Sequence, residues 1–293
     1  MIRPSTFSIV AYDLDENAWG VAVASKFLAV GAVVPWARAG QGAVATQAYA
    51  NTSYGPKALA LLGSGLSAQE TLNRLLADDD GRDQRQVGLV DMQGRAAAYT
   101  GSACYDWAGH IVGPHFTCQG NILVSQATVQ AMADTFSSAK GELAERLVKA
   151  LAAGEEAGGD SRGRQSAAVL VVKPEGGYAG FNDRYLDLRV DDDPQPVQRL
   201  AELLRLHQLY FQHSPVKDRI KIQGKVLREI KQMLANQNLL AASESASSDE
   251  YDNGTRQAFE QLIGRENLED RCNPAEGWID PPALDYLRQH FLT

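Results

Sequence analysis

A hydroxyl and an amine stand side by side near the beginning of the chain, where an apolar stretch ends. Ser25 and Lys26 follow the run Gly20 to Ala24, which has the composition of a buried strand. A lysine whose pKa is depressed by burial can take a proton from a hydroxyl, here from Ser25 or from Thr6 in the preceding strand. The alternative is a lysine that reaches water from the strand end, as most lysines do.

Side-chain amides occupy the ends of other predicted strands. Gln47 and Asn51 flank the end of one apolar strand, and Asn121 follows Gly120 where a strand gives way to a helix. Amide and backbone N–H groups in such places can bind an oxyanion or a substrate carboxylate. Asparagine is also an ordinary turn residue, so a purely structural role is the alternative.

A glycine-rich connection carries cationic and amide side chains into a later strand. Arg162 and Gln165 leave this connection just before Ser166. A bidentate guanidinium there would suit a carboxylate or ureido substrate. Solvation of the loop is the alternative.

Composition argues against several classes of function. Ser243 to Thr293 holds eleven Asp or Glu against four Arg, within a net charge of -8, so the chain repels phosphate backbones and we expect no nucleic-acid partner. Its three cysteines are scattered and its five histidines lack metal-ligand spacing, so we expect neither metal nor cofactor. No apolar run approaches the roughly 18 residues of a membrane span and no signal peptide is evident, which predicts a cytoplasmic protein without a membrane partner.

The strands and helices that position these residues are predicted from the pattern of apolar residues and from the turn-forming clusters between them. Paired strands are expected where apolar runs are separated by turn clusters, and helices where leucines recur at helical spacing or where Ser67 and Glu70 form a capping box. Strands are predicted at Thr6 to Ala11, Trp19 to Ala24, Gly31 to Trp36, Gly42 to Gln47, Gln86 to Asp91, Arg95 to Tyr99, Phe116 to Asn121, Ser166 to Val172 and Phe181 to Val190. Sequential hairpins with helices between blocks of strands favour an α+β layered domain over a doubly wound parallel sheet.

Length and pattern divide the chain in two. At 293 residues it exceeds the usual size of one core. We place the strand-containing domain at residues 1–212 and a small helical domain at residues 213–293, with helices expected at Asp218 to Met233, Thr255 to Gly264 and Pro281 to Phe291.

Several blocks in order resemble the family called domain of unknown function 1028 (DUF1028). The blocks are Thr6 to Ala11, Gly20 to Phe27, Gly42 to Ala48, Asn51 to Pro56, Gly120-Asn121 and Gly159 to Ala168, so the resemblance spans about Ser5 to Gln212. That family is regarded as similar to the N-terminal-nucleophile (Ntn) hydrolases, which implies a four-layer αββα sandwich. Proteasome-like members carry a serine near the active site in the strand after the glycine-rich turn, and this resemblance points to Ser166.

The same resemblance implies a nucleophile and its base. In Ntn hydrolases an N-terminal Thr, Ser or Cys attacks a carbonyl and its own α-amine, with a pKa of about 7.7 to 8, takes the proton. Thr6 stands at the nucleophile's position, but five residues precede it, so the mechanism requires cleavage between Ser5 and Thr6. An ordinary strand threonine is the alternative. Lys26 stands where proteasome-like members have an acid, which is a departure.

The expected function is hydrolysis of an amide or ureido C–N bond in a small metabolite by an Ntn-type amidohydrolase. The alternative is a non-catalytic protein that binds a ligand or partner on the same scaffold, and in either case a homo-oligomer is expected. The segment from Thr255 to Pro281 resembles a peptidoglycan-binding domain, which implies cell-wall glycan as a further partner. Trp278 is the one evident aromatic platform for a sugar there.

Overall fold

The computed structural model describes residues 6–212, 214–241 and 250–292. The chain forms two compact units, Met1–Leu204 and Arg205–Thr293. The division falls inside helix α5 (Pro196–Phe211), N-terminal to the boundary that the sequence predicted at residue 212. Each unit has its own hydrophobic core.

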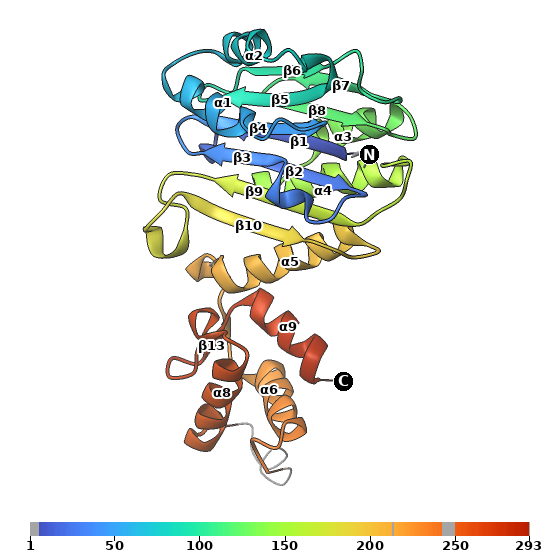
Figure 1. Ribbon diagram of the computed structural model, residues 1–293. Helices are drawn as coiled ribbons and strands as arrows, with labels where there is room; N and C mark the ends of the chain where they lie inside the picture. The colour runs from blue at the N-terminus through green and yellow to red at the C-terminus, as the bar shows by residue number, and fades with distance from the viewer. Residues whose placement is uncertain (1–5, 213, 242–249, 293) are drawn as a thin grey trace. The chain divides into compact units, whose positions relative to one another are not determined.

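The first unit contains a six-stranded and a four-stranded antiparallel sheet (Figure 1). The larger sheet has the order β10-β9-β2-β1-β8-β7, formed by β1 (Thr6–Asp13), β2 (Ala18–Ser25), β7 (Gly109–Gly113), β8 (Phe116–Asn121), β9 (Ser166–Val172) and β10 (Arg184–Val190). The smaller sheet has the order β3-β4-β5-β6, formed by β3 (Pro35–Arg38), β4 (Gly42–Ala48), β5 (Arg85–Asp91) and β6 (Ala96–Thr100). A mixed α/β chain with antiparallel sheets is therefore confirmed.

Alternation along the opening hairpin divides its side chains between two cores. Phe7 and Ile9 belong to the core under helices α3 (Ala127–Ser138) and α4 (Leu143–Glu156). Val10 and Tyr12 belong to a second core that also holds side chains of β4 and β5 and therefore lies between the sheets. Since successive strand residues point to opposite faces, Thr6 and Ser8 share the face of Val10.

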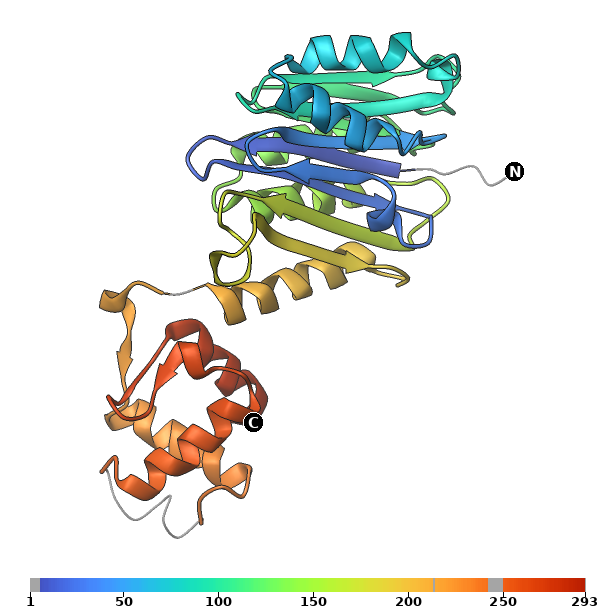
Figure 2. The ribbon, with the colours of Figure 1, turned by 60° about the vertical axis from the view of Figure 1, so that its left-hand side comes forward.

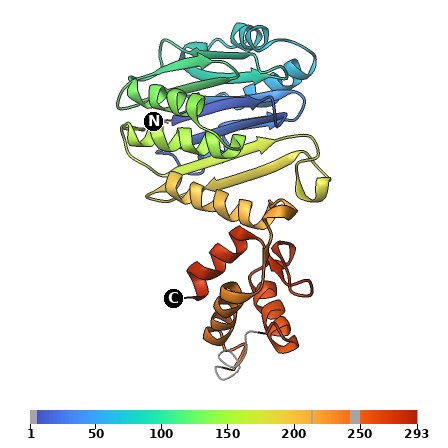
Figure 3. The same cartoon turned by 180° about the vertical axis from the view of Figure 1, so that it is seen from behind.

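Helices cover the outer face of each sheet. Helices α1 (Tyr54–Gly63) and α2 (Ala68–Ala77) pack on the four-stranded sheet through a third core (Figure 2). Helices α3 and α4 pack on the six-stranded sheet (Figure 3). The capping box at the start of α2 is confirmed: Ser67 Oγ accepts from the Glu70 N–H, and the Glu70 carboxylate accepts from the Ser67 N–H.

Two segments differ from the elements that the sequence predicted. The expected strand from Gly31 begins instead as a 3-10 turn, Val30–Ala32, and β3 starts at Pro35. A contact distant in sequence holds this turn, because the Ser166 hydroxyl accepts from the Val30 N–H at 3.1 Å. Strand β7 was not predicted, since its residues alternate only weakly. It is an edge strand that pairs with β8.

The second unit is built mainly from helices. Its described residues include the end of α5 and the helices α6 (Gly224–Asn236), α8 (Asn253–Arg265) and α9 (Pro281–Phe291). A small sheet contains β11 (Ile220–Lys221), β12 (Cys272–Asn273) and β13 (Trp278–Ile279). Leu227, Phe259 and Leu284, one from each helix, are almost fully buried in the core.

Candidate active site

Two hydroxyl groups meet at one end of the central hairpin. Thr6 opens β1 and Ser25 closes β2, so antiparallel pairing brings them to the same end of the sheet. Their oxygens lie 3.2 Å apart, and both residues are 2% exposed. The two hydroxyls that the sequence offered as proton donors to Lys26 therefore lie within hydrogen-bond distance of each other.

A chain of buried polar side chains lies beside this pair, between the two sheets. Gln119 donates through Nε2 to Ser8 Oγ at 2.7 Å, and Ser8 Oγ donates to Gln47 Oε1 at 2.6 Å. These contacts orient the Gln47 amide so that its Nε2 lies 3.3 Å from the Thr6 carbonyl oxygen. Buried amides need such partners, since a buried donor or acceptor without a hydrogen bond lowers stability by about 1–3 kcal/mol.

Gln86 connects this chain to the strand beside Thr6. Its Oε1 accepts from Gln47 Nε2 at 2.8 Å and from Asn121 Nδ2 at 2.9 Å. Its Nε2 donates to the Gly120 carbonyl at 2.7 Å, which bridges the two sheets. Asn121 is the register partner of Thr6, so Thr6, Gln47 and Asn121 do come together as site residues predicted from the sequence.

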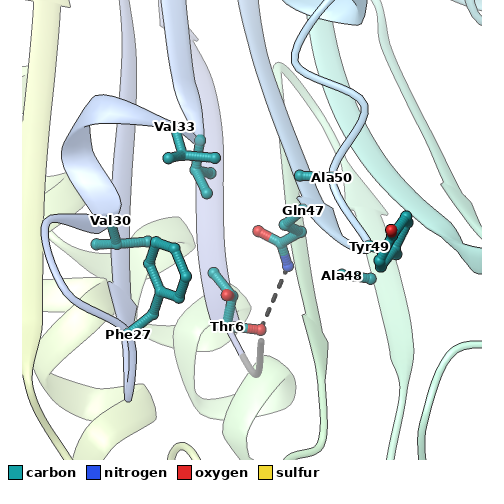
Figure 4. Close-up of a pocket in the computed structure, with 9 residues that line it drawn as sticks. Thr6, Phe27, Val30, Val33, Gln47, Ala48, Tyr49 and Ala50 are labelled. Carbon is teal, nitrogen blue, oxygen red and sulfur yellow. Dashed lines mark hydrogen bonds between the residues drawn. The ribbon is translucent and has the colours of Figure 1, made fainter. Parts of the chain in front are cut away.

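A cavity of about 250 Å³ opens at Thr6 and Gln47 (Figure 4). Phe27 and Val30 lie on one side of it, and Ala48 and Tyr49 on the other, with Thr6 and Gln47 between them. The remaining lining residues are Val33, Val34 and Ala50. Among the described residues that line this cavity, none carries a carboxylate, an imidazole or an amine. A smaller cavity of about 60 Å³ adjoins Ser25, with Glu155, Asp160 and Arg164 in its wall, and burial raises the pKa of Glu155.

Strained backbone surrounds the hydroxyl pair. Ala29, Ala48 and Ile122 have φ values of 53°, 66° and 51°, in the left-handed region that side chains rarely adopt. Ala48 directly follows Gln47, Ile122 directly follows Asn121, and Ala29 precedes the turn that lines the cavity. Such conformations cost about 1–3 kcal/mol each and gather at functional sites, which agrees with a site at this end of the sheets.

Lys26 and Arg162 lie in a separate polar cluster. Asp160 accepts from the Lys26 backbone N–H at 2.6 Å and pairs with Arg162 at 3.2 Å, while Arg162 also donates to the Lys26 carbonyl. The Lys26 side chain is exposed, with Nζ 3.2 Å from the Arg164 carbonyl. The burial that a Lys26 base would require is therefore absent, and Arg162 is not among the residues lining the larger cavity.

Ser166 and Gln165 have structural partners. The Ser166 hydroxyl donates to the Phe27 carbonyl and accepts from the Val30 N–H, so it fixes the segment that forms one wall of the cavity. Gln165 donates to the Asp192 carboxylate at 3.0 Å in an exposed position. The structure thus places Ser166 behind the site, and Gln165 does not line the cavity.

Asn51 faces a different network. Its amide donates to Asp79 Oδ2 at 3.1 Å, and Asp79 also accepts from Tyr54 and from Arg85. A cavity of about 290 Å³ adjoins Asn51 and Tyr54 on the helix side of the smaller sheet. Asn51 does not line the cavity at Thr6.

Comparison with known proteins agrees with the resemblance noted in the sequence. The model of the family of unknown function DUF1028 matches residues 6–200. The chain belongs to this family. A crystal structure of the DUF1028 protein SPO2555 from Silicibacter pomeroyi is similar, with 32% sequence identity, a TM-score of 0.64, and coverage of 70% of this chain and 89% of that one. No curated protein matches this DUF1028 chain.

Three polar residues of this DUF1028 site were not among the residues that the sequence singled out for it. They are Ser8, Gln86 and Gln119, all almost fully buried. The available signal was a polar residue within a predicted strand, in each of three strands. What the sequence alone did not provide was the pairing of the strands, which brings these side chains into one network.

Two other features are absent from the described parts of the DUF1028 chain. Across residues 6–212, 214–241 and 250–292, no cluster of three His, Cys, Asp or Glu side chains could hold a metal ion. Over the same ranges, no helix has the length and apolar character needed to cross a membrane.

Proposed function

We propose that this protein hydrolyses an amide or ureido C–N bond in a small molecule, with Thr6 as the nucleophile. The observation that carries the proposal is the position of Thr6. Its hydroxyl lies 3.2 Å from that of Ser25, and Thr6 lines a cavity of about 250 Å³. Strained backbone beside Gln47 and Asn121 supports the same location.

The base in this proposal is the α-amine of Thr6. Cleavage of the bond between Ser5, which lies outside the described residues, and Thr6 would expose it. Near neutral pH an α-amine with a pKa of about 7.7 to 8 is partly unprotonated, so it can accept the Thr6 hydroxyl proton. Thr6 Oγ1 then bonds to the substrate carbonyl carbon, the C–N bond breaks, and the amine product leaves with that proton. Water hydrolyses the resulting ester and restores the hydroxyl.

Gln47 is the proposed donor to the substrate carbonyl oxygen. One Nε2 hydrogen is held by Gln86 Oε1 at 2.8 Å, whereas the contacts with the carbonyls of Thr6 and Gln119 are long, at 3.3 and 3.4 Å. The hydrogen in these long contacts is therefore the one available to an oxyanion in the cavity. Asn121 then acts through Gln86, by orienting the Gln47 amide.

The layer order supports an Ntn-hydrolase relationship as part of the proposal. Helices α1 and α2, the smaller sheet, the larger sheet, and helices α3 and α4 follow one another through three cores. The proposed nucleophile opens a central strand, as it does in Ntn hydrolases. This assignment rests on analogy of architecture, and the chemistry must be tested at Thr6 itself.

Substitution of Thr6 provides the test. A panel of small amides and ureides is assayed with the parent chain, Thr6→Ala and Thr6→Ser, and circular dichroism verifies folding. We expect turnover by the parent, loss of at least about 10³-fold in Thr6→Ala, and partial activity in Thr6→Ser, which keeps a hydroxyl nucleophile. Full activity of folded Thr6→Ala would exclude Thr6 as the nucleophile.

A non-catalytic binding protein is the second candidate. It is favoured by the five residues that precede Thr6 and by the lack of a side-chain base among the described cavity residues. Binding of an amide to the parent chain without turnover, across the whole panel, would support this candidate over the enzyme.

Glycan binding by the second unit stays a prediction. The Trp278 ring has the Arg219 guanidinium 3.8 Å from its centroid, so a sugar would have to use the other ring face or displace the arginine. Retention of the full chain on purified peptidoglycan, lost in Trp278→Ala, is the result that would support it. Self-association also stays a prediction, testable by light scattering.

A further inference from the structure

The walls of the cavity at Thr6 are apolar in character. Phe27, Val30, Val33 and Val34 form one part, and Ala48 and Tyr49 contribute another. The polar side chains of the lining are Thr6 and Gln47, which lie between these walls, and the Tyr49 hydroxyl at the edge (Figure 4). A ligand with a carbonyl group beside Thr6 would therefore place the rest of its acyl group against hydrocarbon.

The two cationic side chains that the sequence singled out are engaged elsewhere, and Arg85, which lies against the Tyr49 ring, is paired with Asp79. Arg162 is paired with Asp160, and Lys26 Nζ contacts the Arg164 carbonyl in an exposed position. Neither residue lines the cavity at Thr6. A carboxylate carried into this cavity would lose water without gaining a cation among the described lining residues, which is strongly unfavourable.

The volume limits the size of the ligand group. An apolar protein cavity of about 150 Å³ can hold a benzene molecule, so a cavity of about 250 Å³ accepts a ring with a short substituent. A phenylacetyl or a branched aliphatic acyl group falls within this limit. Tyr49 is 56% exposed, so it marks the side from which the cavity meets solvent.

We infer that the cavity selects an uncharged, apolar acyl group, and that the substrate is a neutral small amide rather than one bearing a carboxylate on its acyl part. This inference rests on the proposed function for the reaction, but the ligand class can be measured without turnover. It narrows the substrate expected from the sequence, where Arg162 pointed to a carboxylate or ureido group.

Binding to the full-length Thr6→Ala chain separates ligand class from catalysis. Calorimetry compares phenylacetamide with succinamate, the carboxylate-bearing monoamide of succinate. We expect phenylacetamide to bind at least about tenfold more tightly, because burial of an unpaired carboxylate is costly. Equal or tighter binding of succinamate, or no binding of phenylacetamide, would overturn the inference. If phenylacetamide binds more tightly than succinamate but the parent chain turns over neither amide, the proposed hydrolysis is excluded while the preference for an apolar, uncharged ligand is supported.

Two variants that add a cation make the test sharper. Val33→Arg and Tyr49→Arg each bring a guanidinium to the cavity wall at a position that is not fully buried, and Val112→Arg on strand β7 serves as the exposed control. We expect both wall variants to lower the affinity for phenylacetamide and raise that for succinamate by about tenfold, with the control unchanged. A folded Tyr49→Arg chain with unchanged preference would contradict the inference even if Val33→Arg fails to fold.

Discussion

Asp79 accepts hydrogen bonds from three side chains on the helix side of the smaller sheet. Its carboxylate accepts from Arg85 at 2.9 Å, Tyr54 at 2.8 Å and Asn51 at 3.1 Å. The hydrogen bond from Arg85 is the main reason that the pKa of Asp79 lies well below its ordinary value. Burial, followed by the hydrogen bond to Asp79, raises the pKa of Tyr54.

Replacement of Asp79 tests this network and its pH dependence. Asp79→Asn should lower the free energy of unfolding by about 2 kcal/mol at pH 7, since hydrogen bonds to a charged group are lost. Because the pKa of Asp79 is lower in the folded than in the unfolded chain, its charge stabilises the fold at pH values above the unfolded pKa of about 3.9. This stability is lost as the pH falls from there toward the folded pKa. The difference between parent and variant should therefore shrink below about pH 4 in denaturant titrations.

A neighbouring aspartate supplies the control for that experiment. Asp80 is exposed, so Asp80→Asn should change stability by less than about 0.5 kcal/mol at any pH. A difference between parent and Asp79→Asn that stays constant from pH 7 to pH 3 would contradict a role for the Asp79 charge.

Individual site residues could be predicted only in part. Thr6, Gln47 and Asn121 were identified as candidates and lie together, because Thr6 and Asn121 are opposite each other in paired strands and Gln47 reaches them from the facing sheet. Gln86 was missed because its role depends on contacts with side chains from two other strands. Lys26 was chosen for its neighbours in sequence, but its side chain points to solvent and not to the hydroxyl pair.

Helix and strand boundaries could be predicted from the sequence where they depend on residues close together in the chain. The capping box placed the start of α2 correctly, since both of its hydrogen bonds lie within four residues. The turn at Val30 was missed because Ser166, far along the chain, holds it. Tertiary contacts override local preference in such places.

Two helical glycines distinguish packing from helix propensity. In α1, a Cβ at Gly55 would lie 2.2 Å from Trp36 Cδ2, whereas in α8 a Cβ at Gly264 would meet nothing nearer than 3.8 Å. Gly55→Ala should destabilise by about 1–3 kcal/mol through overpacking, and Gly264→Ala should stabilise by up to about 1 kcal/mol. Amide hydrogen exchange in the surrounding unit measures each effect, and a stabilising Gly55→Ala would refute the close packing of α1 on Trp36.

At the scale of the whole molecule, each unit has its own core, so we expect the two units to unfold independently. In the second unit Arg271 is paired with Asp280 at 3.2 Å, with side chains 2% and 4% exposed. Asp280→Asn leaves a buried cation without its counter-charge, which should cost about 3–5 kcal/mol. Hydrogen exchange should then accelerate in α6 and α8 and stay unchanged in β1 and β2. Equal acceleration in both units would show that they unfold together.

If Thr6 becomes an N-terminal nucleophile, the active chain must start at Thr6. Mass spectrometry of the intact purified protein, with N-terminal sequencing, is performed on the fraction that turns over amides. We predict a chain that begins at Thr6, and a Thr6→Ala chain that keeps the residues before position 6 and lacks turnover. An active chain that still carries residues before Thr6 would exclude the Thr6 α-amine as the base.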